Sequence, residues 1–236
     1  MRAARLAIAM SMVLGCASAR AATITGHVRI AGSIPKPPTI TMTADPTCDH
    51  LFPHGRPAEN IVAGADGSLA NVFVYVKSGF PKKFVFPAGP AGEARLDQKG
   101  CAFVPHAIGV RVGQEISIHS SDETLHNVDA RGALNAPFNE AMVGAGSTLV
   151  KAFQHPEVAV KLKCDIHPWM TAYVGVFDHP FFAVTGPDGT FTISGLPESD
   201  GYTVEAWHES LGTRTTKIAV DDDKKSYTAD FSFVGN

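Results

Sequence analysis

The stretch Cys-Asp-Ile-His-Pro-Trp-Met at residues 164–170 holds three candidate metal ligands within seven residues. The thiol of Cys164, the imidazole of His167 and the thioether of Met170 have C-x2-H-x2-M spacing, which suits one tight loop at the end of a strand. Copper that alternates between Cu(I) and Cu(II) needs soft sulfur for one state and nitrogen for the other, and a His2Cys plane with a weak axial Met serves both. The stretch therefore predicts a copper site that still lacks one histidine.

A candidate for the missing histidine lies upstream, close to a predicted strand. Residues 114–119 alternate between apolar and polar side chains, as a half-buried strand does. The sequence Leu-His-Asn-Val follows at residues 125–128, and its His126 lies 38 residues before Cys164. That separation is long enough for several antiparallel strands to bring the two residues together.

The His-Asn-Val context and the single loop with Cys, His and Met resemble the cupredoxins, and the short loop is most similar to that of the amicyanins. The resemblance implies that His126, Cys164, His167 and Met170 hold one mononuclear blue (type 1) copper. It also implies that Asn127 supports the ligands by tying the two ligand segments together. Without the resemblance, Cys164 can also be a buried structural or redox-only cysteine. Zinc is the rival metal, although Met is a poor zinc ligand and no C-x2-C pair includes Cys164.

Three neighbouring residues each have two interpretations. Asp165 either raises the electron density at the metal or simply points to water. Trp169 either presents an apolar surface to a docking partner or packs on a neighbouring domain. His106 is either an auxiliary ligand or partner-facing residue, or a hydrogen-bonded structural histidine, and we favour the structural role.

Residues 1–22 have the features of a secretory signal peptide. A positive segment at residues 1–5 precedes an apolar segment at 6–14, and Ala-Ser-Ala at 17–19 is a cleavage signal. Cys16 ends an imperfect lipoprotein motif, so cleavage before it would leave a lipid anchor. We therefore expect export to the periplasm, with membrane attachment only if Cys16 is lipidated.

The net charge argues against one class of partner, and the number of cysteines predicts a disulfide. If cleavage follows Ala19, the loss of Arg2 and Arg5 changes the formal net charge from -3 to -5, which argues against binding to nucleic acid. Three cysteines then remain, and in an oxidising compartment two of them should pair. If a metal holds Cys164, then Cys48 and Cys101 form the disulfide.

Short segments separated by Gly, Pro and Asn predict an all-β fold. Residues 95–180 have the size and turn spacing of a Greek-key cupredoxin sandwich. The Asp-Gly-x-Phe-x-Ile-x-x-Leu-Pro run at residues 188–197, followed by Gly-Tyr-x-Val at 201–204, resembles the carboxypeptidase regulatory-like, transthyretin-like β-sandwich. That family usually begins with a Gly-x-Val strand, which this chain has at residues 26–28.

The resemblance implies that the cupredoxin sandwich is inserted in the smaller one. Residues 23–80 and 181–236 would then share one core, with residues 81–94 as a linker. A simple tandem arrangement of the two sandwiches is the alternative.

The chain as a whole resembles secreted bacterial proteins labelled as methylamine-utilisation proteins. The expected function is transfer of single electrons by one copper between periplasmic redox proteins, such as a c-type cytochrome and a dehydrogenase or oxidase. We expect His167 to expose one edge to these partners, and we expect no enzymatic activity. The alternatives are copper storage or delivery, and a non-catalytic binding module with a vestigial copper site.

Overall fold

The computed structural model describes residues 21–87, 93–221 and 223–235. The predicted signal peptide up to residue 20, with Cys16, lies outside these residues, as do residues 88–92 of the predicted linker. Within the described ranges, no helix is long and apolar enough to cross a membrane. Nearly all of the regular structure is β, so the prediction of an all-β fold is confirmed.

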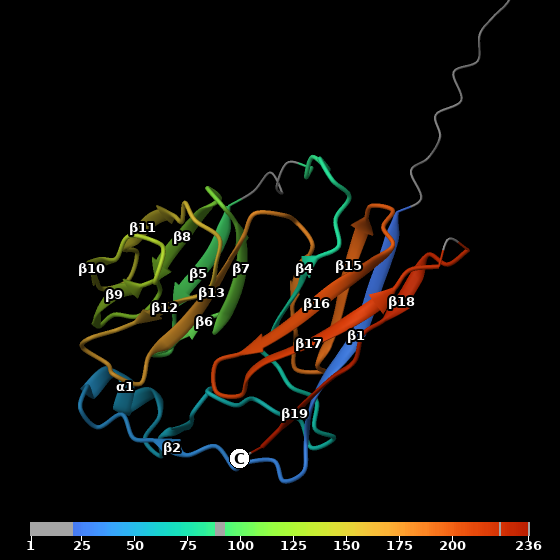
Figure 1. Cartoon of the computed structure of the whole chain (residues 1–236). Coiled ribbons are helices and arrows are strands. Elements are labelled where there is room, and N and C mark those ends of the chain that lie inside the picture. The colour runs from blue at the N-terminus through green and yellow to red at the C-terminus, as the bar shows by residue number, and fades with distance from the viewer. Residues whose placement is uncertain (1–20, 88–92, 222, 236) are drawn as a thin grey trace, which may run out of the picture.

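One sandwich combines strands from both ends of the described chain (Figure 1). Its first sheet is centred on β1 (Ala22–Ala31), which pairs with β15 (Thr190–Leu196), β18 (Ser226–Thr228) and β19 (Phe231–Val234). Its second sheet has the order β14 (Phe182–Val184), β4 (Phe73–Ser78), β16 (Gly201–His208) and β17 (Gly212–Ala219). Strand β1 alternates between buried and exposed side chains because only one face of its sheet meets the core. Residues that are far apart in the sequence therefore share one hydrophobic core.

The other sandwich is built from the middle of the chain. Its first sheet has the order β10 (Phe138–Val143), β9 (Leu125–Arg131), β12 (Glu157–Lys163), β13 (Thr171–Phe177) and β7 (Ala107–Arg111). Its second sheet has the order β11 (Thr148–Ala152), β8 (Glu115–Ser120), β5 (Ala94–Gln98) and β6 (Phe103–Val104). Strands β9 and β12 pair directly and antiparallel, with Asp129 opposite Lys163, so the first residues of β9 lie beside the loop that follows β12. This pairing brings two segments of the predicted metal site together.

A short helix, α1 (Pro46–Leu51), interrupts the segment before the middle sandwich, next to the small ribbon of β2 (Thr39–Ile40) and β3 (Arg56–Pro57). Asp45 caps the helix by accepting a hydrogen bond from the Cys48 backbone N–H at 2.9 Å, and Pro46 occupies its first turn. Six residues are too few to show helical periodicity, so the sequence did not predict this helix. Cys48 forms a disulfide with Cys101 across a Cα–Cα distance of 5.9 Å, which confirms the predicted pair.

The two sandwiches meet through aromatic side chains. Phe73 of β4 is fully buried, stacks on Trp207 with 5.6 Å between ring centroids, and contacts the edge of Phe177. Trp207 also lies 5.4 Å from the ring of Tyr173 on β13. Phe73 and Phe177 are buried, and Trp207 and Tyr173 are half-buried. This aromatic cluster stabilises the contact between the sandwiches through apolar burial.

His208, the last residue of β16, gives a prediction about stability and pH. Burial lowers its pKa from 6.5 to about 4, and its Nδ1 accepts the backbone N–H of Ser210. Between these pH values the unfolded state binds a proton that the folded state does not. The contribution of His208 to the free energy of unfolding is therefore full above pH 6.5 and is lost as the pH falls towards about 4.

The measurement is chemical unfolding of wild type and His208→Asn at several pH values. We expect the stability difference between the two proteins to change by about 3 kcal/mol between the two pKa values. Asn keeps an acceptor for Ser210 but does not titrate. A difference that stays constant with pH would contradict this role for His208.

Candidate metal centre

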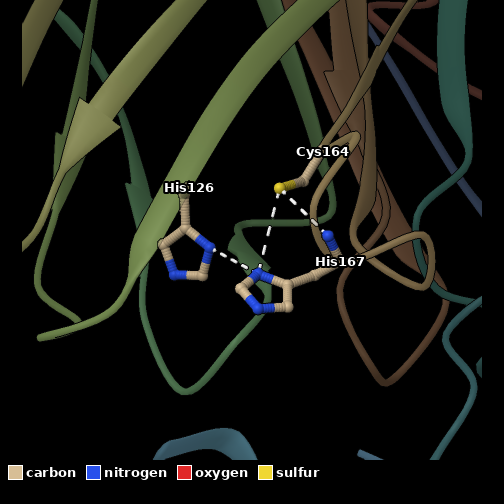
Figure 2. Close-up of side chains that lie close together, drawn as sticks. All are labelled: His126, Cys164 and His167. Atoms are coloured by element: carbon tan, nitrogen blue, oxygen red, sulfur yellow. Dashed lines mark hydrogen bonds between the residues drawn. The ribbon is translucent and has the colours of Figure 1, made fainter. Parts of the chain in front are cut away.

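Three of the four predicted ligands converge at one end of the middle sandwich (Figure 2). His126 is on β9, whereas Cys164 and His167 are on the loop between β12 and β13. Hydrogen bonds from the Cys164 N–H to the Met170 carbonyl (3.1 Å) and from the Met170 N–H to the His167 carbonyl (2.9 Å) close this loop. Because strands on both sides anchor the loop, its side chains are held in one arrangement.

The distances define a compact cluster. Nδ1 of His126 lies 2.9 Å from Nδ1 of His167, and Sγ of Cys164 lies 3.9 Å from the same His167 atom. His126, Cys164 and His167 are at most 1% exposed. Met170 is also buried, in the same hydrophobic core as Cys164, and directly precedes β13. Figure 2 shows both Nδ1 atoms and the sulfur pointing towards one another.

The protonation of the cluster favours binding of a cation. Burial by itself raises the pKa of the Cys164 thiol, but hydrogen bonds from His126 and from backbone N–H groups outweigh burial and hold this pKa below its ordinary value. Burial by itself lowers the pKa of His126, but hydrogen bonds to Asp122 and Cys164 outweigh it and raise this pKa to about 9. Both shifts favour a thiolate beside a protonated imidazole, and a metal ion can take the place of that proton.

Two carboxylates that the sequence analysis missed contact the outer nitrogens of the histidines. Nε2 of His126 lies 3.0 Å from Oδ2 of Asp122, and Nε2 of His167 lies 3.2 Å from Oδ2 of Asp45. A carboxylate only accepts, so each Nε2 donates its hydrogen and each Nδ1 faces the cluster, where it can bind a metal in place of a proton. Asp122 stands four residues before His126, a spacing that gave a weak signal, whereas no pattern in the sequence links Asp45 to His167.

Asn127 links β9 to the loop that carries Cys164 and His167. Its Oδ1 accepts the backbone N–H of Asp165 at 2.7 Å, and its Nδ2 donates to Asn139 and to the Asp165 carboxylate. The Asp165 side chain is exposed and forms an ion pair with Lys163 at 2.5 Å. Its charge is therefore directed to the surface and neutralised there.

Trp169 packs within the middle sandwich, whereas His106 lies between the two sandwiches. The Trp169 ring lies 5.2 Å from the His167 ring, and its Nε1 donates to the carbonyl of Cys101 at 3.2 Å. The indole thus packs on the disulfide-bearing loop of its own sandwich, a contact that neither interpretation included. His106 is buried and its Nε2 pairs with Glu209 of the other sandwich, so it joins the two sandwiches.

The expectation that His167 exposes one edge is wrong. His167 is 1% exposed, because Asp45 and the start of α1 cover its outer nitrogen, with Sγ of Cys48 at 4.0 Å. Asp45, Cys48 and His167 also lie close enough to hold a metal, but Cys48 is in the disulfide and offers no thiolate. The sequence carried no pattern that places a segment 120 residues upstream over this ligand.

A cavity of about 270 Å³ adjoins the loop of residues 164–170 between β12 and β13, called the ligand loop below. Trp169 and Met170 line it together with residues of the segment after α1. Among these, Arg56 is neutralised by Glu59 at 3.1 Å and donates to the carbonyl of Gly100. The cavity therefore has a polar side whose charges are already paired.

The donor set fits copper. Two imidazole nitrogens and one thiolate sulfur all lie within 4.8 Å of one another in a buried site, and a thioether residue is next in the same loop. This is the His2Cys combination with an available methionine that both oxidation states of copper tolerate. Zinc accepts the same nitrogens and sulfur but does not use a thioether.

Comparison with solved structures finds partial likenesses to copper proteins. A purple cupredoxin from Nitrosopumilus maritimus is 20% identical, with 36% of this chain and 99% of that chain covered and a TM-score of 0.31. Amicyanin from Paracoccus versutus is 17% identical, with 44% and 97% covered and a TM-score of 0.33. A copper-containing nitrite reductase from Thermus scotoductus is 18% identical, with 40% and 27% covered and a TM-score of 0.34.

No family model matches the chain, and no curated protein matches it. The assignment of the metal centre therefore rests on its own side chains.

Proposed function

We propose that this chain is a mononuclear copper protein that carries single electrons between redox proteins of the periplasm. The observation that carries the proposal is the buried convergence of His126, Cys164 and His167, with Met170 in the same loop. These four residues are the proposed ligands of a type 1 centre. When bound, copper supplies the one-electron change between Cu(II) and Cu(I).

The protein holds the ligands in nearly the same positions for both oxidation states. Asn127 connects β9 to the ligand loop, and Asp122 and Asp45 fix the orientation of the two imidazoles. Because the site is almost completely buried, water has little access as an additional ligand. Low reorganisation on a change of charge is what electron transfer requires.

The cover over His167 favours electron transfer over copper delivery. A delivery protein must release its metal rapidly to a partner, but here α1 and Asp45 lie over the centre and the disulfide ties them in place. We propose a c-type cytochrome or a periplasmic dehydrogenase or oxidase as partner, and no nucleic acid. Attachment to a membrane depends on lipidation of Cys16.

The test uses mature protein loaded with one equivalent of Cu(II). We expect a reversible one-electron wave in voltammetry and oxidation of the Cu(I) form by an oxidised c-type cytochrome before a Cu(I) chelator removes measurable metal. Rapid transfer of Cu(I) to the chelator, without a reversible wave, would favour storage or delivery. Absence of copper uptake would leave a binding module with a vestigial site.

A further inference from the structure

The disulfide and the two carboxylates at the centre are connected by a symmetrical set of hydrogen bonds. The backbone N–H of Cys48 donates to Oδ1 of Asp45 at 2.9 Å, and the backbone N–H of Cys101 donates to Oδ2 of Asp122 at 2.8 Å. Asp45 contacts Nε2 of His167, and Asp122 contacts Nε2 of His126. Each half of the disulfide thus supports the carboxylate that contacts one of the proposed histidine ligands.

Additional contacts restrict both carboxylates. Oδ2 of Asp45 accepts the hydroxyl hydrogen of Thr124 at 2.7 Å, and Oδ1 of Asp122 accepts the backbone N–H of Gly100 at 2.7 Å. Both half-cystines are fully buried.

We propose that Asp45, Asp122 and the Cys48–Cys101 disulfide form a clamp that positions both histidine ligands of the copper centre. Asp45 and Asp122 are positioning residues, and the disulfide keeps Asp45, with α1, over His167. This inference rests on the proposed copper function. Asp45 and α1, which precede the middle sandwich in the sequence, thus complete a centre whose proposed ligands all come from that sandwich.

The physical reason is the effect of a carboxylate on the opposite ring nitrogen. A carboxylate that accepts from Nε2–H fixes the tautomer and the ring orientation, and makes Nδ1 a stronger donor. Stronger nitrogen donation stabilises Cu(II) more than Cu(I). Loss of such a supporting residue typically lowers metal affinity 10–100-fold.

The first experiment compares Asp122→Asn and Asp45→Asn with Asp129→Asn. We expect each of the first two to weaken Cu(II) binding about 10–100-fold while Cu(I) binding changes less. Each tenfold loss relative to Cu(I) raises the one-electron potential by about 59 mV. Asp129 is a buried carboxylate on β9 that pairs with Arg131 and Lys163 and not with a proposed ligand, so it controls for the change in charge.

We expect Asp129→Asn to keep the wild-type affinities and potential. Equal shifts in all three variants would show an effect of overall charge and would overturn the positioning role. Unchanged affinities and potential in Asp122→Asn and Asp45→Asn would overturn it as well.

The second experiment tests the role of the disulfide with a double-mutant cycle. In a Cys48→Ala/Cys101→Ala background, α1 is no longer tied to the middle sandwich, and we expect Asp45→Asn to have little further effect on Cu(II) affinity. The same 10–100-fold loss in both backgrounds would show that Asp45 is held without the disulfide.

If the cysteine-free chain does not fold, Thr124→Val replaces it. This variant removes the hydroxyl that holds Asp45, so we expect a loss of Cu(II) affinity that is not additive with that of Asp45→Asn. Full additivity would contradict the clamp.

These outcomes can be separated from failure of the proposed function. If wild-type protein binds no copper through Cys164, the proposed function fails. If wild type shows the thiolate-to-copper absorption but the two aspartate variants keep the wild-type potential, only the clamp fails.

Discussion

Replacement of Cys164 by serine is expected to abolish the intense thiolate-to-Cu(II) charge-transfer absorption of the copper-loaded protein. Cys164 is the one described cysteine outside the disulfide, and hydrogen bonds stabilise its thiolate. A serine hydroxyl stays protonated and is a poor ligand for Cu(I). Because loss of a supporting residue alone costs 10–100-fold in affinity, loss of this ligand should cost more than about 100-fold.

The measurement is a Cu(II) titration followed by visible absorption and electron paramagnetic resonance. His119→Gln is the matched control, since His119 lies on β8 and bonds to Thr148 rather than to the cluster. We expect this control to keep the absorption. A spectrum that is the same in wild type and Cys164→Ser would exclude a Cys-ligated cupric site.

Replacement of Phe73 by alanine is expected to lower the free energy of unfolding by about 3–5 kcal/mol. The ring is fully buried between the two sandwiches, against Trp207 and Phe177. Alanine would leave a cavity in a place where both sides are β-sheet and cannot easily collapse. The loss should therefore weaken the contact between the sandwiches, because Phe73 belongs to the cluster that lies between them.

Chemical unfolding followed by tryptophan fluorescence measures this effect, because Trp207 lies beside the removed ring. Val234→Ala is the control, since Val234 is 61% exposed on β19 and should change stability by less than about 0.5 kcal/mol. A loss below about 1 kcal/mol in Phe73→Ala would show that the two sandwiches do not depend on this contact.

The sequence was most informative where the chemistry is local. The loop at residues 164–170 carries Cys, His and Met at a spacing that one turn can present, so a metal site could be proposed there without any distance. Alternating side chains predicted strands such as β1 and β8, because a two-residue period requires only a half-buried sheet. Cysteine arithmetic in an exported chain, together with the assignment of Cys164 to a metal, predicted the pair of Cys48 with Cys101, and the structure confirms that pair.

The residues that contact the proposed ligands could not be predicted from the sequence. Asp45 lies 122 residues from His167, and its carboxylate reaches that imidazole only because the disulfide and the cap of α1 hold it there. The expected exposed edge of His167 was wrong for the same reason. A contact between residues that are distant in the sequence leaves no periodic pattern, so no local pattern predicts it.

By itself, therefore, the sequence determined the all-β class and the loop that carries Cys, His and Met, since each depends on residue type and short spacing. It predicted the disulfide once Cys164 was assigned to the metal. Only the tertiary structure decided which groups face those donors. Pairing of β9 with β12 brings His126 to the ligand loop, and packing of α1 over the loop buries His167. These outcomes depend on how whole sheets and a remote segment pack, because burial and long-range hydrogen bonds are properties of the folded chain.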